Sequence, residues 1–254
     1  AFDGQAIQPQ ALSDNLAPTS DRNLILNTQD NVDLVDSLKG LFQDSTEISK
    51  QYREGMVGRT AGFAGIYENT LIPNFTNGAG AGYLVNGAAQ SGSSLIVDTG
   101  TGALPKGAIF TIANVFAVHP ESRLSTGVLQ QFVVTSAYTG GAGTVSIYPA
   151  IVASGALQTV NAVPADNAAI TVYNTASDVT TTSLAFHKDA FTFATADLVM
   201  PKGVDFAARE VYDGISIRVV RQYDVNSDSF PCRLDILYGY KAIRPQLACR
   251  IQSN

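Results

Sequence analysis

Charge is scarce in this chain of 254 residues. Asp, Glu, Lys and Arg make up 15% of it, against roughly 25% in typical soluble domains. Gly, Ala, Ser, Thr and Asn take the place of the missing charge. That mixture suits short strands and turns, and it suits surfaces that are covered by neighbouring molecules rather than by water. Hydrophobic residues make up 45%, so the chain is long and apolar enough for one large core or two ordinary ones.

Basic residues are few and scattered. The formal net charge is −6, the pI is near 4.8, and there are 16 Lys and Arg residues in all. The closest basic cluster is only Arg218 with Arg221. Proteins that bind nucleic acid concentrate basic residues on one face, because contacts with phosphates dominate their affinity. The sequence therefore argues against sequence-specific recognition of DNA or RNA.

Long apolar runs and cysteine frameworks are also lacking. No run approaches the length of about 18 residues that a transmembrane helix needs, and no signal peptide is visible, so no membrane partner is expected. The two cysteines, Cys232 and Cys249, could form one bridge, but one bridge is no disulfide framework. We expect reduced, buried thiols, and we place Cys232 on an inward strand face.

Residues suited to catalysis or metal binding are almost absent. The chain has two histidines, His119 and His187, and neither has a metal-like spacing to another ligand. No GxSxG elbow or DxDxDG loop is present. The GAGAG stretch at Gly78–Gly82 lacks the pattern of a phosphate-binding loop and is interpreted as a flexible joint. The sequence predicts no catalytic, cofactor-binding or metal-ligating residue, and no cofactor. A hydrolase would need His187 beside a Ser or Thr nucleophile and an acid.

The N-terminal part has mixed patterns. LILN (24–27) has the composition of a short buried strand. Residues 30–42 carry apolar positions at helical spacing, and DSTE at 44–47 is a capping box that predicts a second helix. GFAGIYENTLIPNF (62–75) is interpreted as an extended arm.

Charge almost vanishes from about residue 81 to residue 176, and short β-rich runs replace the helical spacing. These runs are SLIVD (94–98), AIFTIANVFAV (108–118), QQFVVTSAY (130–138), GTVSIYPAIV (143–152) and AAITVYN (168–174). Turn signals such as GTG, PKG, GGAG and PADN separate them. Four to six strands at this spacing predict a compact barrel or sandwich that is inserted into the host fold.

The C-terminal part predicts an antiparallel hairpin. GISIRVVRQYD (214–224) alternates apolar and polar residues, CRLDILY (232–238) does the same, and NSDS provides the turn between them. We expect this hairpin to lie in the core of the host domain, which would explain why it carries no chemistry.

Three stretches of the chain together resemble the P22-type major coat proteins of tailed bacteriophages. They are APTSDRNLILN (17–27), QYREGMVGRTAGFAGIYENTLIPNFTNGAGAGY (51–83), and the region from LAFHKDAFTFATADLVMP (184–201) through the hairpin to LYGYKAIRPQLACRI (237–251). The resemblance implies an α+β class with the HK97-like coat fold. Residues 1–82 and 177–254 would form a capsomer-centre domain with a central antiparallel sheet and flanking helices, and residues 83–176 an inserted β-barrel domain.

The resemblance also implies a function. The chain would be a non-enzymatic subunit of an icosahedral capsid that encloses the DNA genome. It would assemble with itself into pentamers and hexamers in the host bacterial cytoplasm, with scaffolding and portal proteins as further partners, and would end in the virion. Family members carry an N-terminal arm, an extended loop and a spine helix before the matched region. The 254 residues alone are therefore expected to form monomers or small oligomers.

A binding module is the alternative from another class. A small β-barrel can hold a carbohydrate or a partner protein, and a pocket lined by aromatic side chains would favour that function. The aromatic residues of the segment fall mostly on strand patterns, which favours core positions for Phe110, Phe116, Phe132, Tyr138, Tyr148 and Tyr173.

Overall fold

The computed structural model describes residues 12–38 and 62–253, and most of them are in β-strands. The chain divides into two compact units. The first unit comprises Ala1–His187 and Gln246–Asn254, and the second comprises Lys188–Pro245. The fold is mostly β with a helical contribution, whereas the sequence predicted an α+β class. The second predicted helix, from Asp44, lies outside the described residues.

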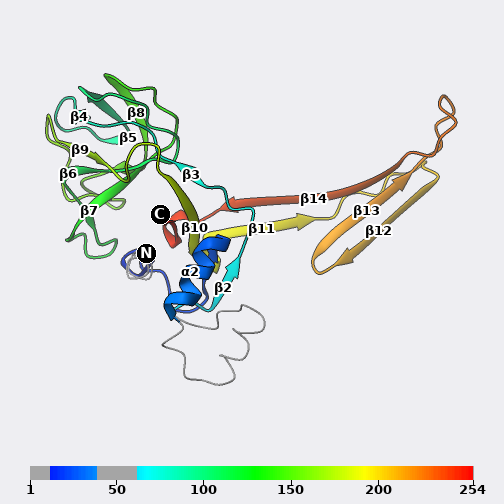
Figure 1. The fold of residues 1–254 in the computed structure, drawn as a ribbon. Helices are drawn as coiled ribbons and strands as arrows, with labels where there is room; N and C mark the ends of the chain where they lie inside the picture. The colour runs from blue at the N-terminus through cyan, green and yellow to red at the C-terminus, as the bar shows by residue number, and fades with distance from the viewer. Residues whose placement is uncertain (1–11, 39–61, 254) are drawn as a thin grey trace. The chain divides into compact units, whose positions relative to one another are not determined.

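The first unit contains a sheet in the order β15-β10-β1-β2, with β3 also paired to β10 (Figure 1). Its strands are β1 (Arg22–Leu26), β2 (Gly65–Glu68), β3 (Phe75–Thr76), β10 (Val179–His187) and β15 (Ala248–Ser253). The short buried strand expected at 24–27 is confirmed, since β1 alternates buried and half-buried residues. The expected extended arm contains β2, which pairs in parallel with β1.

Helix α2 (Thr28–Leu38) packs beside this sheet. The side chain of Asn27 caps it by accepting a 3.2 Å hydrogen bond from the amide of Gln29. Asp30 in the first turn is buried and accepts hydrogen bonds from the hydroxyls of Thr181 (2.7 Å) and Ser183 (2.6 Å) on β10. The helix was expected over residues 30–42. It begins two residues earlier, at Thr28, because the side chain of Asn27 caps its N-terminus. Residues 39 to 42 lie outside the described part of the chain.

Residues 84–172 form a six-stranded sheet in the order β4-β5-β8-β7-β6-β9. Its strands are β4 (Leu84–Val85), β5 (Gly92–Asp98), β6 (Ile109–Val118), β7 (Ser125–Val134), β8 (Gly143–Ile151) and β9 (Ile170–Val172). The sheet closes on itself: the amide of Ile170 donates to the carbonyl of Tyr83, and the amide of Val85 donates to the carbonyl of Ala168. The five β-rich runs of the sequence all contain strands of this barrel.

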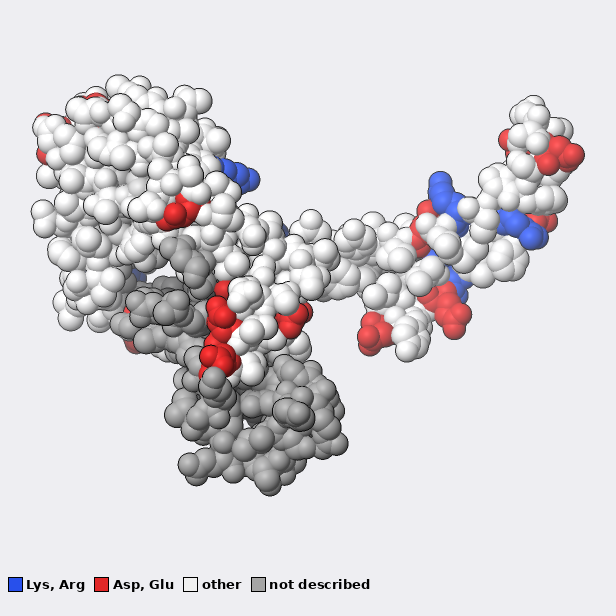
Figure 2. All heavy atoms as spheres, in the orientation of Figure 1, with Lys and Arg blue, Asp and Glu red and all other residues white. Residues whose placement is uncertain are grey.

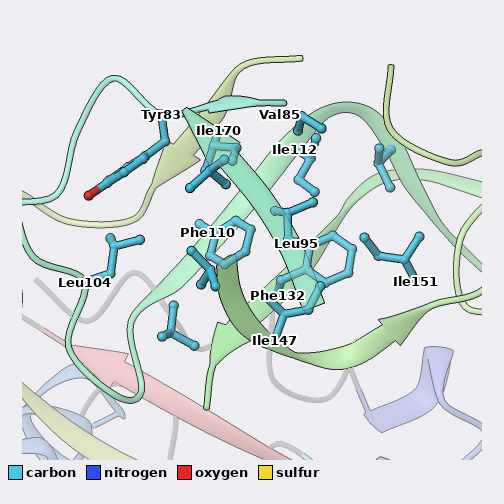
Figure 3. Packing of buried hydrophobic residues seen from close by; sticks show 14 of the residues in the cluster. Tyr83, Val85, Leu95, Leu104, Phe110, Ile112, Phe132, Ile147, Ile151 and Ile170 are labelled. Atoms are coloured by element: carbon cyan, nitrogen blue, oxygen red, sulfur yellow. The ribbon is translucent and has the colours of Figure 1, made fainter. Parts of the chain in front are cut away.

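The barrel interior is filled by apolar side chains that point toward one another (Figure 3). Phe110 and Phe132 are stacked at its centre with ring centroids 5.7 Å apart, and both are almost completely buried. Tyr83 closes one end, where its hydroxyl donates a hydrogen bond to the carbonyl of Gly102. Burial of this ring raises the pKa of Tyr83, and the neighbouring Tyr138 raises it further. This part of the chain therefore has a close-packed core of its own.

The glycines at 78–82 are not a flexible joint, which corrects the sequence interpretation. The amide of Ala81 donates to the carbonyl of Thr101, and Thr101 donates back to Ala81. A Cβ atom on Gly78 would lie 2.2 Å from the carbonyl oxygen of Ala103, and one on Gly80 would lie 2.5 Å from a methyl group of Leu104. Glycine is required at Gly78 and Gly80, because residues 103 and 104 lie too close to leave room for a Cβ atom there.

The second unit is a four-stranded antiparallel sheet in the order β11-β14-β13-β12. Its strands are β11 (Phe191–Ala196), β12 (Phe206–Tyr212), β13 (Ile215–Arg221) and β14 (Cys232–Ala242). The predicted hairpin is confirmed, because β13 pairs antiparallel with β14 and the bridge between Asp224 and Ser229 closes its turn. The expectation that this hairpin lies in a core is wrong, since nearly all of β14 is exposed.

The domain boundaries expected from sequence, at 82/83 and 176/177, stay a prediction. The barrel cluster of buried residues extends from Tyr83 to Ile170, with Val172 packed against it. The division into compact units falls instead at 187/188 and 245/246, because the second unit makes its contacts almost entirely within itself.

Candidate functional site

The histidines occupy structural positions. His187 is buried at the end of β10, where it stands opposite Arg22 in the sheet register. His119 lies in a turn, where its Nδ1 accepts from the amides of Glu121 and Ser122 at 3.3 Å each. Over residues 12–38 and 62–253, no group of three or more His, Cys, Asp or Glu side chains could hold a metal ion. The geometry therefore directs attention to surfaces rather than to a reactive centre.

The surface with the clearest organisation is the sheet of the second unit. The pairing register places Ile217 opposite Ile236, and Glu210 on β12 opposite Ile217. On the other side of β14, Phe193 stands opposite Tyr240. Because side chains alternate between the two faces of a strand, this register assigns every residue of the four strands to one face or the other.

One face of this sheet is almost entirely apolar, and we call it the apolar face. Its large side chains come from all four strands, and each of them is exposed: Phe191, Phe193, Phe206, Tyr212, Ile215, Ile217, Leu234, Ile236, Tyr238 and Tyr240. The rings of Phe193 and Tyr238 are stacked, with centroids 5.9 Å apart. Single exposed apolar residues are ordinary, but a contiguous set of this size marks an interaction site.

The opposite face, called here the charged face, carries ion pairs. Arg218 lies opposite Asp235 in the register and contacts its carboxylate at 2.5 Å. The guanidinium of Arg233 reaches the other oxygen of Asp235 at 2.8 Å, and Arg209 pairs with Asp197 at 3.3 Å. Figure 2 shows basic and acidic side chains gathered on the second unit, whereas the visible face of the barrel is mostly uncharged.

The electrostatics of the charged face centre on Asp235. Its carboxylate accepts hydrogen bonds from both the Nε and an Nη atom of Arg218. These bonds favour the ionised form, so they lower the pKa of Asp235 below its ordinary value of 3.8, with a smaller lowering from Arg233. Asp235 is therefore an ionised acceptor shared by two arginines of the charged face.

The apolar face carries two charged residues, Glu210 on β12 and Arg221 on β13, and the charge of Arg221 is compensated. Its guanidinium lies 5.8 Å from the ring centroid of Phe206 and 5.5 Å from that of Phe230. Asp205 accepts two hydrogen bonds from it, at 2.8 and 3.0 Å. An arginine that is stacked on aromatic rings and paired with a carboxylate can be covered by a partner at little cost.

Both cysteines are free thiols, as expected, but the expectation that both are buried is wrong. Cys232 is exposed on the apolar face, opposite Arg221. Cys249 on β15 is partly covered, and burial raises its pKa to about 11. The prediction failed for Cys232 because alternation along a strand shows that one face is apolar, not that anything covers that face.

A shallow groove of about 360 Å³ lies beside the barrel, between residues 78–82 and residues 170–176. Its lining contains glycine, alanine and the short polar and aliphatic residues of the β9 strand, and no aromatic side chain. Of the aromatic residues expected at core positions, Phe110 and Phe132 are in the barrel core, whereas the expectation is wrong for Tyr148 and Tyr173, which are exposed.

Comparison with known proteins identifies the family. A family model described as P22 coat protein (gene protein 5) matches residues 9–251. The chain belongs to the P22 coat protein family. The solved I-domain of the CUS-3 coat protein is 30% identical to this chain, with a TM-score of 0.28, over 36% of this chain and 95% of that one. A search of curated proteins found no match.

Membership in the P22 coat protein family makes the chain a structural subunit of a phage capsid, and its place is the virion. No helix in the described part of the chain is long and apolar enough to cross a membrane. Sequence reasoning found the apolar alternation of the hairpin but placed it in a core, so it missed that the apolar face of this coat subunit is exposed. The alternation of β14 continues beyond Tyr238 to Tyr240 on the same face.

Proposed function

We propose that this coat subunit has the HK97-like fold and assembles with itself into the pentamers and hexamers of an icosahedral shell around the DNA genome. Scaffolding and portal proteins are its further partners, and assembly takes place in the host cytoplasm. In this proposal the barrel at 83–176 is an inserted domain of the capsomer-centre fold, and catalysis has no part in the function.

The observation that carries the proposal is the combination of family membership with an unpartnered apolar face. Coat subunits act in many copies, so parts of their surfaces make contacts with identical neighbouring subunits. Of the 29 large hydrophobic side chains that are exposed over the described residues, 17 lie in the second unit. That unit has few buried residues of its own, which is the expected state of a surface that is completed by assembly.

A carbohydrate- or protein-binding module is the competing function. It would require a pocket on the barrel with aromatic walls and a few converging polar groups. The groove at 78–82 and 170–176 has no aromatic side chain in its lining, and the central aromatic rings of the barrel are packed in its core. Shell assembly also explains the exposed apolar face of the second unit, which a binding pocket on the barrel would leave unexplained.

The test is electron microscopy of the natural form of this protein, produced alone and together with its scaffolding protein. The proposal expects closed shells with pentameric and hexameric capsomers, with the scaffolding protein raising their yield. A protein that stays in discrete small complexes under both conditions, at concentrations where related coat proteins assemble, would contradict it.

A further inference from the structure

We infer that the apolar face of the second unit binds a second copy of this chain in the assembled shell, while the charged face stays outside that contact. The inference rests on the proposed function and adds to it which of the two faces makes the contact. The apolar face is defined by the ten large side chains named above, and the charged face by Arg209, Arg218, Arg233 and Asp235.

The apolar face cannot be satisfied within its own unit. The second unit is a single layer, and among its described residues no helix or second sheet covers either side (Figure 1). A sheet with one apolar side reaches a stable arrangement by packing that side against another layer. Tyr212 is 82% exposed, Tyr240 is 80% exposed and Leu234 is 70% exposed, so the missing layer would cover side chains along much of the sheet.

The area of the face matches what a specific interface needs. Large aromatic side chains present about 150–250 Å² each, and the ten side chains are between 37% and 82% exposed. Together they expose on the order of 1,000 Å², whereas one partner of a standard interface contributes about 800 Å². The exposed area is thus sufficient for a stable contact with one neighbouring subunit.

The aromatic, charge-poor composition of the apolar face favours an apolar protein surface as its partner. Six of its ten large side chains are Phe or Tyr, as in the core of protein interfaces, where aromatic residues are enriched and charged residues are depleted. An acidic ligand finds no uncompensated positive charge on it, because Asp205 compensates Arg221, and Glu210 is the one other charged side chain that the four strands place on this face. In a shell built from identical subunits, the apolar surface that each copy meets belongs to another copy. A second copy is therefore the occupant.

The charged face is suited to stay in contact with water. Covering it would remove solvent from Arg218, Arg233 and Asp235, and desolvation of ion pairs costs more than their attraction returns unless every group is paired. The side chain of Arg233 is 72% exposed, so its solvation would be lost on that side.

Strand β14 offers a matched pair of positions for a test. Leu234 lies on the apolar face and Leu237 on the charged face, and both are exposed leucines of the same strand. In a Cys232→Ser background of the natural coat subunit, Leu234→Cys and Leu237→Cys place a thiol on either face. The free subunit and the assembled shells are then treated with N-ethylmaleimide, and mass spectrometry of peptides reports the labelling rate at each position.

The expected result is a labelling rate for Leu234→Cys that falls at least about tenfold on assembly, because thiol reactivity follows exposure, while that of Leu237→Cys changes little. Cys232 of the unaltered chain should follow Leu234→Cys, which gives the same measurement if either variant fails to assemble. Equal labelling of Leu234→Cys in subunits and shells would overturn the inference. Protection already in the free subunit would also overturn it, because another part of the same chain would then cover the face.

Assembly itself provides a second readout that separates the two proposals. Leu234→Ser should slow or prevent shell formation in sedimentation velocity, and Leu237→Ser should not. If the parent chain forms shells and Leu234→Ser assembles equally well, the inference fails and the proposed function stands. If the parent forms no shells under any condition, both fail.

Discussion

At the scale of single residues, a few charged side chains on the second unit form ion pairs that contribute to its stability. Asp235 on β14 connects two strands of the charged face, because Arg218 reaches it from β13, and Arg233 pairs with it from β14 itself. Its pKa is lowered chiefly by the hydrogen bonds from Arg218. This stabilisation is present above the ordinary pKa of an aspartate and is lost as the pH falls through the lowered folded-state pKa.

We therefore predict that Asp235→Asn reduces stability at pH 7 and that this difference shrinks steadily below pH 3.8, the ordinary value for the group. Urea unfolding followed by tyrosine fluorescence would measure it, since the chain has 10 Tyr and no Trp. Glu210→Gln on β12, which removes the same charge from an exposed position, is the control. A constant difference between wild type and Asp235→Asn from pH 7 to about pH 3 would contradict the linkage.

The two thiols give a second prediction at this scale. Cys232 is exposed, whereas Cys249 is partly covered and has a pKa raised to about 11. Because the thiolate is the reactive species, the free native subunit at pH 8 should label at Cys232 at least about tenfold faster than at Cys249. Unfolding in urea should bring the two rates together. Similar rates in the native protein would show that the two positions are equally accessible.

At the scale of elements, close backbone approach rather than flexibility explains the glycine-rich stretch at 78–82. A methyl group on Gly78 would collide with the carbonyl oxygen of Ala103 at 2.2 Å, and a backbone atom cannot move aside as a side chain can. Gly82 differs: its φ is +70°, but nothing lies within 4 Å of the position of its Cβ.

We predict that Gly78→Ala destabilises the barrel by about 3 kcal/mol, the upper end of the range for overpacking. Gly82→Ala should cost only about 1 kcal/mol, from the left-handed backbone conformation. Thermal unfolding followed by circular dichroism would measure both. If the stretch were a flexible joint, both substitutions would leave the melting temperature unchanged, and that result would reject the close-packing explanation.

At the scale of the whole molecule, the two kinds of β-structure differ in what stabilises them. The barrel has a buried cluster in which Phe132 and Leu95 are fully covered, and its sheet closes so that no edge remains between β4 and β9. The second unit has an open sheet with an exposed apolar side. A stable sheet needs a covered hydrophobic face.

Residues 83–176 expressed alone are therefore expected to give a β-type circular dichroism spectrum and a cooperative melt. Residues 188–245 expressed alone are the contrasting case, and they should either melt without cooperativity or associate as concentration rises. Sedimentation equilibrium with circular dichroism would test both fragments. A disordered spectrum from 83–176 would reject its independence, and a stable monomer of 188–245 would show that its apolar face needs no partner.

The sequence by itself determined the strands and the turns. Alternation and turn residues act over a few positions, so β13, β14, and the strands β5 to β9 could be predicted from local patterns. Burial could not be predicted in this way, because the alternation along β14 is the same whether or not a second layer covers its apolar side. The exposure of Cys232, the close packing of Gly78 and Gly80 and the closure of the barrel all depend on segments far apart in sequence. Only the tertiary structure decided these, since a contact between two distant segments has no local signature in either one.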